Sequence, residues 1–204
     1  MRLTIDTPSG PAEAELDKPT GTPRALVVIG HGAGGGIDAP DIKAAHSACL
    51  EVGAVVARIL QPYRVAGRRS PSPAPALDAA WLAVVAALRR RRGLGELPLI
   101  TGGRSSGARV ACRTAGAVGA SGVICLAFPL HPPGRPDRSR LPELELVDVP
   151  VLIVQGDRDP FGMPPEAANR SVVVIAGADH GLKRGAAELG HAVHDFVTSL
   201  VRGN

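Results

Sequence analysis

The sequence predicts an α/β fold in which a mostly parallel, twisted sheet of about seven to eight strands is covered by helices on both faces. Two observations predict it. Short runs of apolar, often β-branched residues alternate along the chain with longer helical patterns. No repeat and no linker-like segment interrupts this alternation. We therefore expect residues 1–204 to form a single domain.

The first half of the chain supplies four strands and two helices. The opening pair of strands flanks Pro8-Ser9-Gly10-Pro11, a sequence typical of a hairpin turn. A glycine-rich turn precedes the first helix, and a connection rich in Pro, Arg and Ser, residues 61–75, precedes the second. In order, the predicted elements are strands 3–6, 12–16 and 25–29, helix 41–51, strand 54–60 and helix 76–91.

The second half repeats the alternation and ends in a helix. Its predicted elements are strand 97–101, helix 106–117, strands 122–127, 149–154 and 172–175, and helix 185–201. Residues 128–148 contain five prolines. Because proline interrupts both helices and strands, we expect a loop there with little room for a lid, and no cap domain.

Charge and cysteine usage restrict the partners and the compartment. The net charge of +4 is small, and its densest basic run, 89–92, ends a predicted helix, where cations complement the helix dipole. We therefore expect no nucleic-acid partner. Three cysteines without C-x-x-C spacing fall in apolar segments, typical of a reduced, cytoplasmic protein. No apolar run is long enough for a membrane span, so we expect no membrane partner.

Residues 103–107, Gly-Arg-Ser-Ser-Gly, match the G-x-S-x-G pattern of a nucleophile elbow. The pattern alone is weak, but its context is informative: a predicted strand ends just before it and a predicted helix begins within it. The two glycines allow a sharp turn that exposes the serine between them. We therefore predict that Ser105 is the nucleophile of an α/β-hydrolase.

A serine hydroxyl needs a base that takes its proton and an acid that orients the base. In α/β-hydrolases the acid and then the histidine follow the serine, each on a loop past the carboxyl end of a later strand. His180 is the histidine in that position. The preceding loop carries both Asp157 and Asp159, which cannot both reach one imidazole. We favour Asp159 and keep Asp157 as the alternative.

Other histidines fit a metal site poorly. His46 falls inside a predicted helix, while His191 and His194 are spaced i, i+3 on the last helix without further zinc ligands nearby in the pattern. We expect these side chains to pack or face solvent, and we predict neither a metal nor a cofactor.

An oxyanion hole requires two backbone N–H groups, one from the residue after the nucleophile, here Ser106. The glycine-rich turn at 30–36 is of the H-G-x-G kind and predicts Ala33 as the second donor, with Gly34 as the alternative. The same turn satisfies G-x-G-x-x-G, a dinucleotide fingerprint. Against a nicotinamide enzyme, the helix is expected to begin too late and the next strand ends without an acidic residue.

Five segments resemble the small, lidless α/β-hydrolases related to dienelactone hydrolase, in particular the branch that includes a testis-expressed hydrolase-like protein and a subunit of the non-specific-lethal chromatin complex. The segments are 28–35, 63–69, 102–107, 128–134 and 155–162. The resemblance implies the triad Ser105, Asp159 and His180. It also implies that the substrate site is lined by His31, Gly32, Gly34, Tyr63, Arg69, Arg104 and His131.

The resemblance supports the assignment of the catalytic residues better than it indicates a substrate. Dienelactone hydrolase uses a cysteine nucleophile where this chain has Ser105, so its substrate does not transfer. The predicted function is therefore hydrolysis of small carboxylic esters, thioesters or lactones. A non-catalytic interaction module on the same fold is the alternative, and a homodimer is left open.

Overall fold

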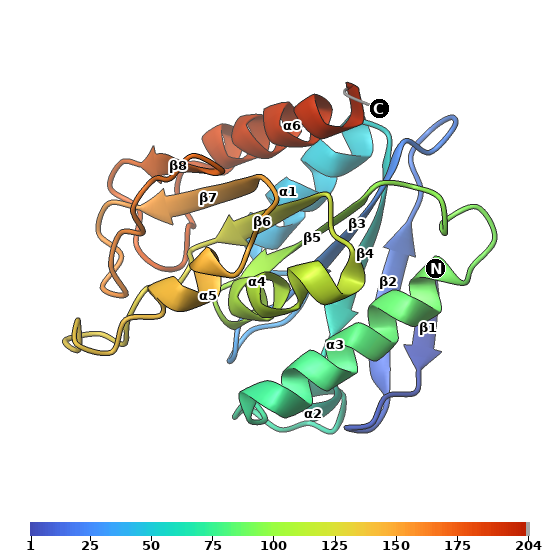
Figure 1. Cartoon of the computed structure of the whole chain (residues 1–204), viewed down its shortest axis with the longest axis horizontal. Coiled ribbons are helices and arrows are strands. Elements are labelled where there is room, and N and C mark those ends of the chain that lie inside the picture. Colours follow the sequence, from blue (N-terminus) through green and yellow to red (C-terminus); the bar gives the residue numbers. More distant parts are fainter. Residues whose placement is uncertain (203–204) are drawn as a thin grey trace.

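The computed structural model describes residues 1–202 and confirms the predicted fold class. Eight strands form one sheet in the order β1-β2-β4-β3-β5-β6-β7-β8 (Figure 1). The strands are β1 (Arg2–Ile5), β2 (Ala12–Asp17), β3 (Ala25–Gly30), β4 (Ala54–Leu60), β5 (Leu99–Arg104), β6 (Gly122–Leu126), β7 (Val151–Gly156) and β8 (Arg170–Ile175). Strands β3 to β8 are parallel, whereas the predicted hairpin β1–β2 adds antiparallel strands beside β4.

Helices cover both faces of the sheet, with α1 and α6 on one face and α3 and α4 on the other (Figure 1). The helices are α1 (Pro40–Glu51), α2 (Pro62–Val65), α3 (Ala74–Arg89), α4 (Ser106–Val118), α5 (Leu141–Glu145) and α6 (Ala186–Arg202). Within residues 1–202 no cap domain is inserted between these elements.

Strand β3 shows why the strands read as continuous apolar runs. All of its residues are buried, with Val27 and Ile29 packed in the core under α1 and α6, and Leu26 and Val28 in the core under α3. Side chains alternate between the two faces of a strand, so a strand covered on both faces needs apolar residues at every position. The carboxyl ends of the parallel strands therefore form one edge at which loops can meet.

The structure corrects several predicted boundaries. Strand β5 begins at Leu99, after Pro98, and continues through two glycines to Arg104. A Cβ at Gly102 would lie 2.5 Å from the carbonyl oxygen of Ile124, so only glycine lets β5 approach β6 here. Helix α3 begins and ends two residues earlier than predicted, with a proline in its first turn.

Two segments predicted as loops contain short helices. Helix α2 falls in the 61–75 connection and α5 in the 128–148 segment, and each has a proline in its first turn. Proline supplies the helical φ angle and lacks an N–H that the first turn would leave unpaired, so it starts a helix as readily as it interrupts one.

The predicted burial of the three cysteines agrees with the structure. Cys49, Cys112 and Cys125 are buried and free. Among the helices of residues 1–202, none combines the length and apolarity that crossing a bilayer requires.

Candidate active site

Ser105 alone forms the turn between β5 and α4. Its φ is 51° and its ψ is −109°, a conformation that costs a residue with a side chain about 1–3 kcal/mol. The turn is held by the Ser105 N–H, which donates to the Leu126 carbonyl at 2.9 Å, and by the Ser105 carbonyl, which accepts from the Arg109 N–H at 3.2 Å. The strained turn holds the Ser105 side chain at the carboxyl edge of the sheet.

The two glycines of the elbow let three segments approach closely. A Cβ at Gly103 would lie 2.7 Å from the Gly30 carbonyl oxygen, and a Cβ at Gly107 would lie 2.6 Å from the same atom. Contacts this short are incompatible with a side chain. The G-x-S-x-G spacing therefore reflects the packing of β5 and α4 against the end of β3.

His180, on the loop between β8 and α6, lies between Ser105 and Asp159. Its Nε2 is 2.9 Å from Ser105 Oγ, and its Nδ1 is 2.8 Å from Asp159 Oδ2. The Asp159 side chain is fully buried, whereas His180 is 18% exposed. The structure thus brings together the three predicted side chains from loops after three parallel strands.

The two candidate acids have different surroundings. The Asp159 carboxylate accepts the Phe161 N–H at 2.9 Å through Oδ1, and Gln155 Nε2 donates to its Oδ2 at 2.9 Å. The exposed Asp157 instead accepts the Gly177 N–H at 2.7 Å, bracing the β7 loop against the β8 loop. In this arrangement Asp159, the favoured residue, is the one that contacts the imidazole.

Two residues at the site were missed by the sequence reasoning. Gln155 is fully buried in β7, and its amide also lies 2.9 Å from the Gly162 carbonyl oxygen. A glutamine in the otherwise apolar run of β7 is the signal that could have found it. The Phe161 ring lies against His180 with ring centroids 4.1 Å apart, a contact that only the folded loop reveals.

The predicted glycine-rich loop is held by two of the predicted substrate residues, His31 within the loop and Tyr63 outside it. His31 is buried, with Nδ1 2.7 Å from the Gly32 carbonyl oxygen and Nε2 3.1 Å from the Gln61 N–H nitrogen. Burial lowers the pKa of His31, the hydrogen bond to the Gly32 carbonyl opposes this shift, and the charge of Arg64 adds to it. A neutral ring with its proton on Nδ1 satisfies both contacts. Tyr63 donates its hydroxyl to the Ala33 carbonyl at 2.8 Å.

The contact between His31 and Gly32 orients one candidate oxyanion donor, the Ala33 N–H. A trans peptide points its N–H opposite to its C=O, so the bond from His31 to the Gly32 carbonyl turns the Ala33 N–H away from His31. Gly32 itself lies beside Ser105, because a Cβ on Gly32 would be 3.5 Å from the Ser105 Cβ. Ser106 is the first residue of α4, where an N–H has no acceptor within the helix. Gly34 is exposed on the same loop.

The remaining predicted substrate residues have other neighbours. Arg104 is ion-paired with Asp41, at 2.9 Å between Nε and Oδ2. The His131 ring is 2.9 Å from the Pro132 carbonyl oxygen through Nδ1 and packs against Gly162. Arg69 is exposed. The Arg104 guanidinium thus faces Asp41, and the His131 ring faces the loop after β7.

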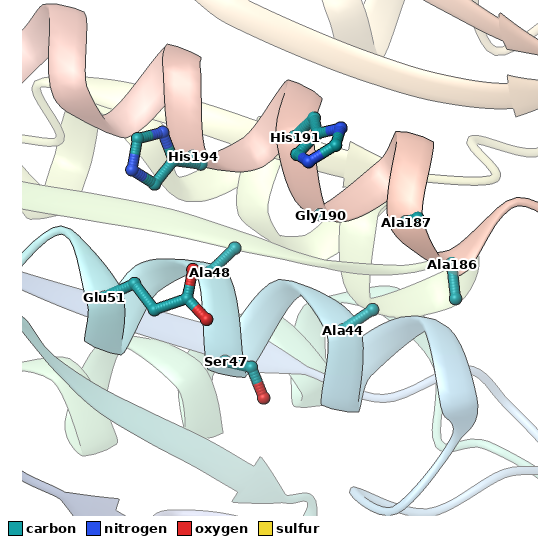
Figure 2. Close-up of a pocket in the computed structure, with 9 residues that line it drawn as sticks. All are labelled: Ala44, Ser47, Ala48, Glu51, Ala186, Ala187, Gly190, His191 and His194. Carbon is teal, nitrogen blue, oxygen red and sulfur yellow. The ribbon is translucent and has the colours of Figure 1, made fainter.

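The hypotheses of a dinucleotide site at the glycine-rich turn and of a metal site at His191 and His194 find no support in the described residues. Helix α1 begins at Pro40, well after the glycine-rich turn, whereas a dinucleotide fingerprint requires the helix to begin within the motif. His191 and His194 line a groove of about 400 Å³ between α1 and α6, which contains none of the predicted site residues (Figure 2). Within residues 1–202 no three potential ligands gather into a metal site.

Comparison with known proteins agrees with this class of fold. Residues 23–201 match the family model described as alpha/beta hydrolase domain, and the chain belongs to that family. Among proteins with curated descriptions, none matches the chain in sequence.

Solved structures share the fold over nearly the whole chain. XC6422 from Xanthomonas campestris, a serine hydrolase without a lid, superposes with a TM-score of 0.80 at 24% identity, covering 98% of this chain and 94% of that one. Est1E from Butyrivibrio proteoclasticus gives 0.79 at 19% identity over 98% and 99%. Dienelactone hydrolase from Anabaena variabilis gives 0.73 at 17% identity over 100% and 96%. These neighbours support the α/β-hydrolase fold.

Proposed function

We propose that the protein is a serine hydrolase that cleaves small carboxylic esters, thioesters or lactones through an acyl-enzyme. One observation carries the proposal: two hydrogen-bond distances, 2.9 Å and 2.8 Å, link Ser105 Oγ through His180 to the buried carboxylate of Asp159. A hydroxyl, an imidazole and a carboxylate in this order are what activation of a serine requires.

In the first half-reaction, Ser105 Oγ attacks the carbonyl carbon of the substrate while His180 Nε2 takes the hydroxyl proton. The N–H groups of Ala33 and Ser106 donate to the oxygen that becomes negative. Collapse of the tetrahedral intermediate breaks the bond to the alcohol or thiol, which leaves with the proton from His180. Ser105 then carries the acyl group.

In the second half-reaction, His180 takes a proton from water, and the resulting hydroxide attacks the acyl carbon. Collapse releases the carboxylic acid and returns the proton to Ser105 Oγ. Throughout, Asp159 accepts a hydrogen bond from the Nδ1–H of His180, which keeps Nε2 free to act as the base. Gln155 and the Phe161 N–H hold that carboxylate in one orientation.

Small, soluble substrates fit this architecture best. The segment after β6 contains only the short helix α5, and no cap domain lies among the described residues. An open site without a lid needs no lipid surface to open it, so we expect short-chain esters to be preferred and no rate increase on micelles. No cofactor takes part in the proposed steps.

The proposal also covers the branch of the family, the compartment and the partners. We place the chain in the branch of the testis-expressed and non-specific-lethal proteins, acting as a single cytoplasmic domain on a small-molecule ester. The three buried, free cysteines are consistent with a reducing compartment. We propose no nucleic-acid or membrane partner, and a homodimer remains open to measurement.

Labelling with a fluorophosphonate, followed by turnover of p-nitrophenyl esters of increasing chain length, tests the proposal. Ser105→Ala is expected to abolish labelling and lower kcat by about 10⁵ to 10⁶-fold. Ser106→Ala is the matched control, because it removes the neighbouring hydroxyl and keeps the backbone N–H. Absence of labelling and turnover in the unmodified protein would favour the interaction module instead.

A further inference from the structure

Arg104, the residue before the nucleophile, connects parts of the site that are distant in sequence. Its Nη2 donates to the main-chain carbonyl of His180 at 3.0 Å. Its Nε lies 2.9 Å from Asp41 Oδ2. One guanidinium, which cannot lose its proton in a protein, therefore contacts both the loop that carries the base and the start of α1.

Asp41 is a fixed anchor for this guanidinium. It lies in the first turn of α1, its side chain is fully buried, and its Oδ1 accepts the Ile42 N–H at 3.0 Å. The amino end of a helix carries partial positive charge, which stabilises a carboxylate there. Burial nevertheless raises the pKa of Asp41, with the charge of Arg104 acting in the opposite direction.

The glycine-rich loop leaves space for this side chain. A Cβ on Gly32 would lie 2.7 Å from Arg104 Nη1, so the guanidinium passes directly against the loop that carries the candidate donor Ala33. The side chain thus contacts the glycine-rich loop, α1 and the His180 loop, while its own backbone ends β5 next to Ser105.

A contribution to stability alone is a poor explanation for this pair. Replacing a buried ion pair with uncharged residues of similar size is often neutral or stabilising, because both charges must leave water. The other main-chain hydrogen bonds of the His180 loop are local turns or join it to the β7 loop, such as the Arg158 N–H donating to the Ala178 carbonyl at 3.0 Å. Arg104 ties the loop to the strand that carries the nucleophile.

We infer that Arg104 and Asp41 are a positioning pair that fixes the main chain of His180 relative to Ser105. The inference rests on the proposed hydrolase function and gives Arg104 a role other than contact with substrate. Because a positioning residue acts on the reacting groups and not on binding, its loss lowers kcat and leaves KM nearly unchanged.

The informative variant is the double substitution Asp41→Asn/Arg104→Met. Asn keeps an acceptor for the Ile42 N–H, Met replaces the aliphatic length of Arg104, and no buried charge is left unpaired. Asp78→Asn/Arg113→Met is the matched control, since this pair joins α3 to α4 at 2.6 Å, its arginine is exposed to a similar degree as Arg104, and it does not contact His180. Thermal unfolding of both variants separates stability from activity.

Two readouts are measured on each variant. The first is kcat and KM with p-nitrophenyl acetate. The second is the downfield proton resonance of the His180 Nδ1–H, assigned by its loss in His180→Ala, which reports on the contact with Asp159 without any turnover. Arg104→Lys is added because an ammonium can pair with Asp41 but cannot reproduce the two-sided contact of the guanidinium.

We expect the Asp41→Asn/Arg104→Met variant to unfold near the temperature of the control, to lose about 10²-fold in kcat with little change in KM, and to lose the His180 resonance. Arg104→Lys is expected to recover little of the kcat. Wild-type kcat and resonance in the double variant would overturn the inference, as would a raised KM at unchanged kcat. If the unmodified protein turns over nothing, the proposed function fails, and the resonance still decides whether the pair positions His180.

Discussion

Replacing Asp159 by Asn puts an amide NH₂ where the structure offers only donors. On one side Oδ1 accepts the Phe161 N–H, and on the other Oδ2 accepts from Gln155 Nε2 and His180 Nδ1. Rotating the Gln155 amide would turn its oxygen toward the Asn NH₂. The same rotation would direct that oxygen at the carbonyls of Phe128 and Gly162, which now accept from Nε2.

In the least costly arrangement, His180 changes to its other tautomer. If the Asn NH₂ donates to His180 Nδ1, the ring proton moves to Nε2, which then cannot take the proton of Ser105. The expected loss in kcat is about 10⁴-fold, equivalent to about 5.5 kcal/mol of transition-state stabilisation. The second N–H of the Asn amide then faces Gln155 Nε2 and remains unpaired, which lowers the free energy of unfolding by about 1–3 kcal/mol. Each kcal/mol lowers Tm by about 2–4 °C in a protein of this size.

Initial rates with p-nitrophenyl acetate and a thermal melt measure both effects. Asp157→Asn is the control: its exposed carboxylate accepts the Gly177 N–H, and Asn retains an oxygen for that bond. Its unfolding free energy is expected to change by less than about 0.5 kcal/mol. A larger kcat loss in Asp157→Asn than in Asp159→Asn would refute the assignment of the acid.

Three further perturbations test the supporting structure. Gly107→Ala places a Cβ 2.6 Å from a β3 carbonyl oxygen and should cost about 1–3 kcal/mol in urea unfolding, whereas Gly116→Ala on the same helix meets no atom within 4 Å and should stabilise slightly. Because burial lowers the pKa of His31, the unfolded state binds that proton first, so stability should fall below about pH 6.5 by at most about 1.4 kcal/mol per pH unit. Urea unfolding of His31→Gln should lack this part of the slope, and an unchanged slope would contradict it. Gln155→Met removes a donor to the acid and should lower kcat by about tenfold with KM unchanged, and an unaltered kcat would show that the remaining contacts suffice.

The alternation of strands and helices was predictable because the residues of each strand indicate its type without reference to the rest of the chain. Strand β3 is apolar at nearly every position, so its type needs no knowledge of its neighbours. The positions of Ser105, Asp159 and His180 were also within reach, since each follows a predicted strand and parallel strands bring their carboxyl ends to one edge.

Contacts that depend on the direction of a long side chain were not predictable. Arg104 was expected at the substrate, yet its guanidinium extends to Asp41, a residue far away in sequence whose burial no local pattern indicates. Helix α2 was hidden for a different reason: a proline reads as an interruption until the structure shows that it occupies the first turn.

The distribution of buried polar groups argues for a chemical role of the site. Within residues 1–202, eight polar or charged residues are buried. Four of them have side chains that contact the site or its glycine-rich loop: His31, Asp41, Gln155 and Asp159. Burying such groups is unfavourable unless each finds a partner, and an inert scaffold has no need to gather them at one edge of a sheet. This concentration supports the proposed hydrolase over a binding module, because orienting an imidazole between a hydroxyl and a carboxylate uses such groups.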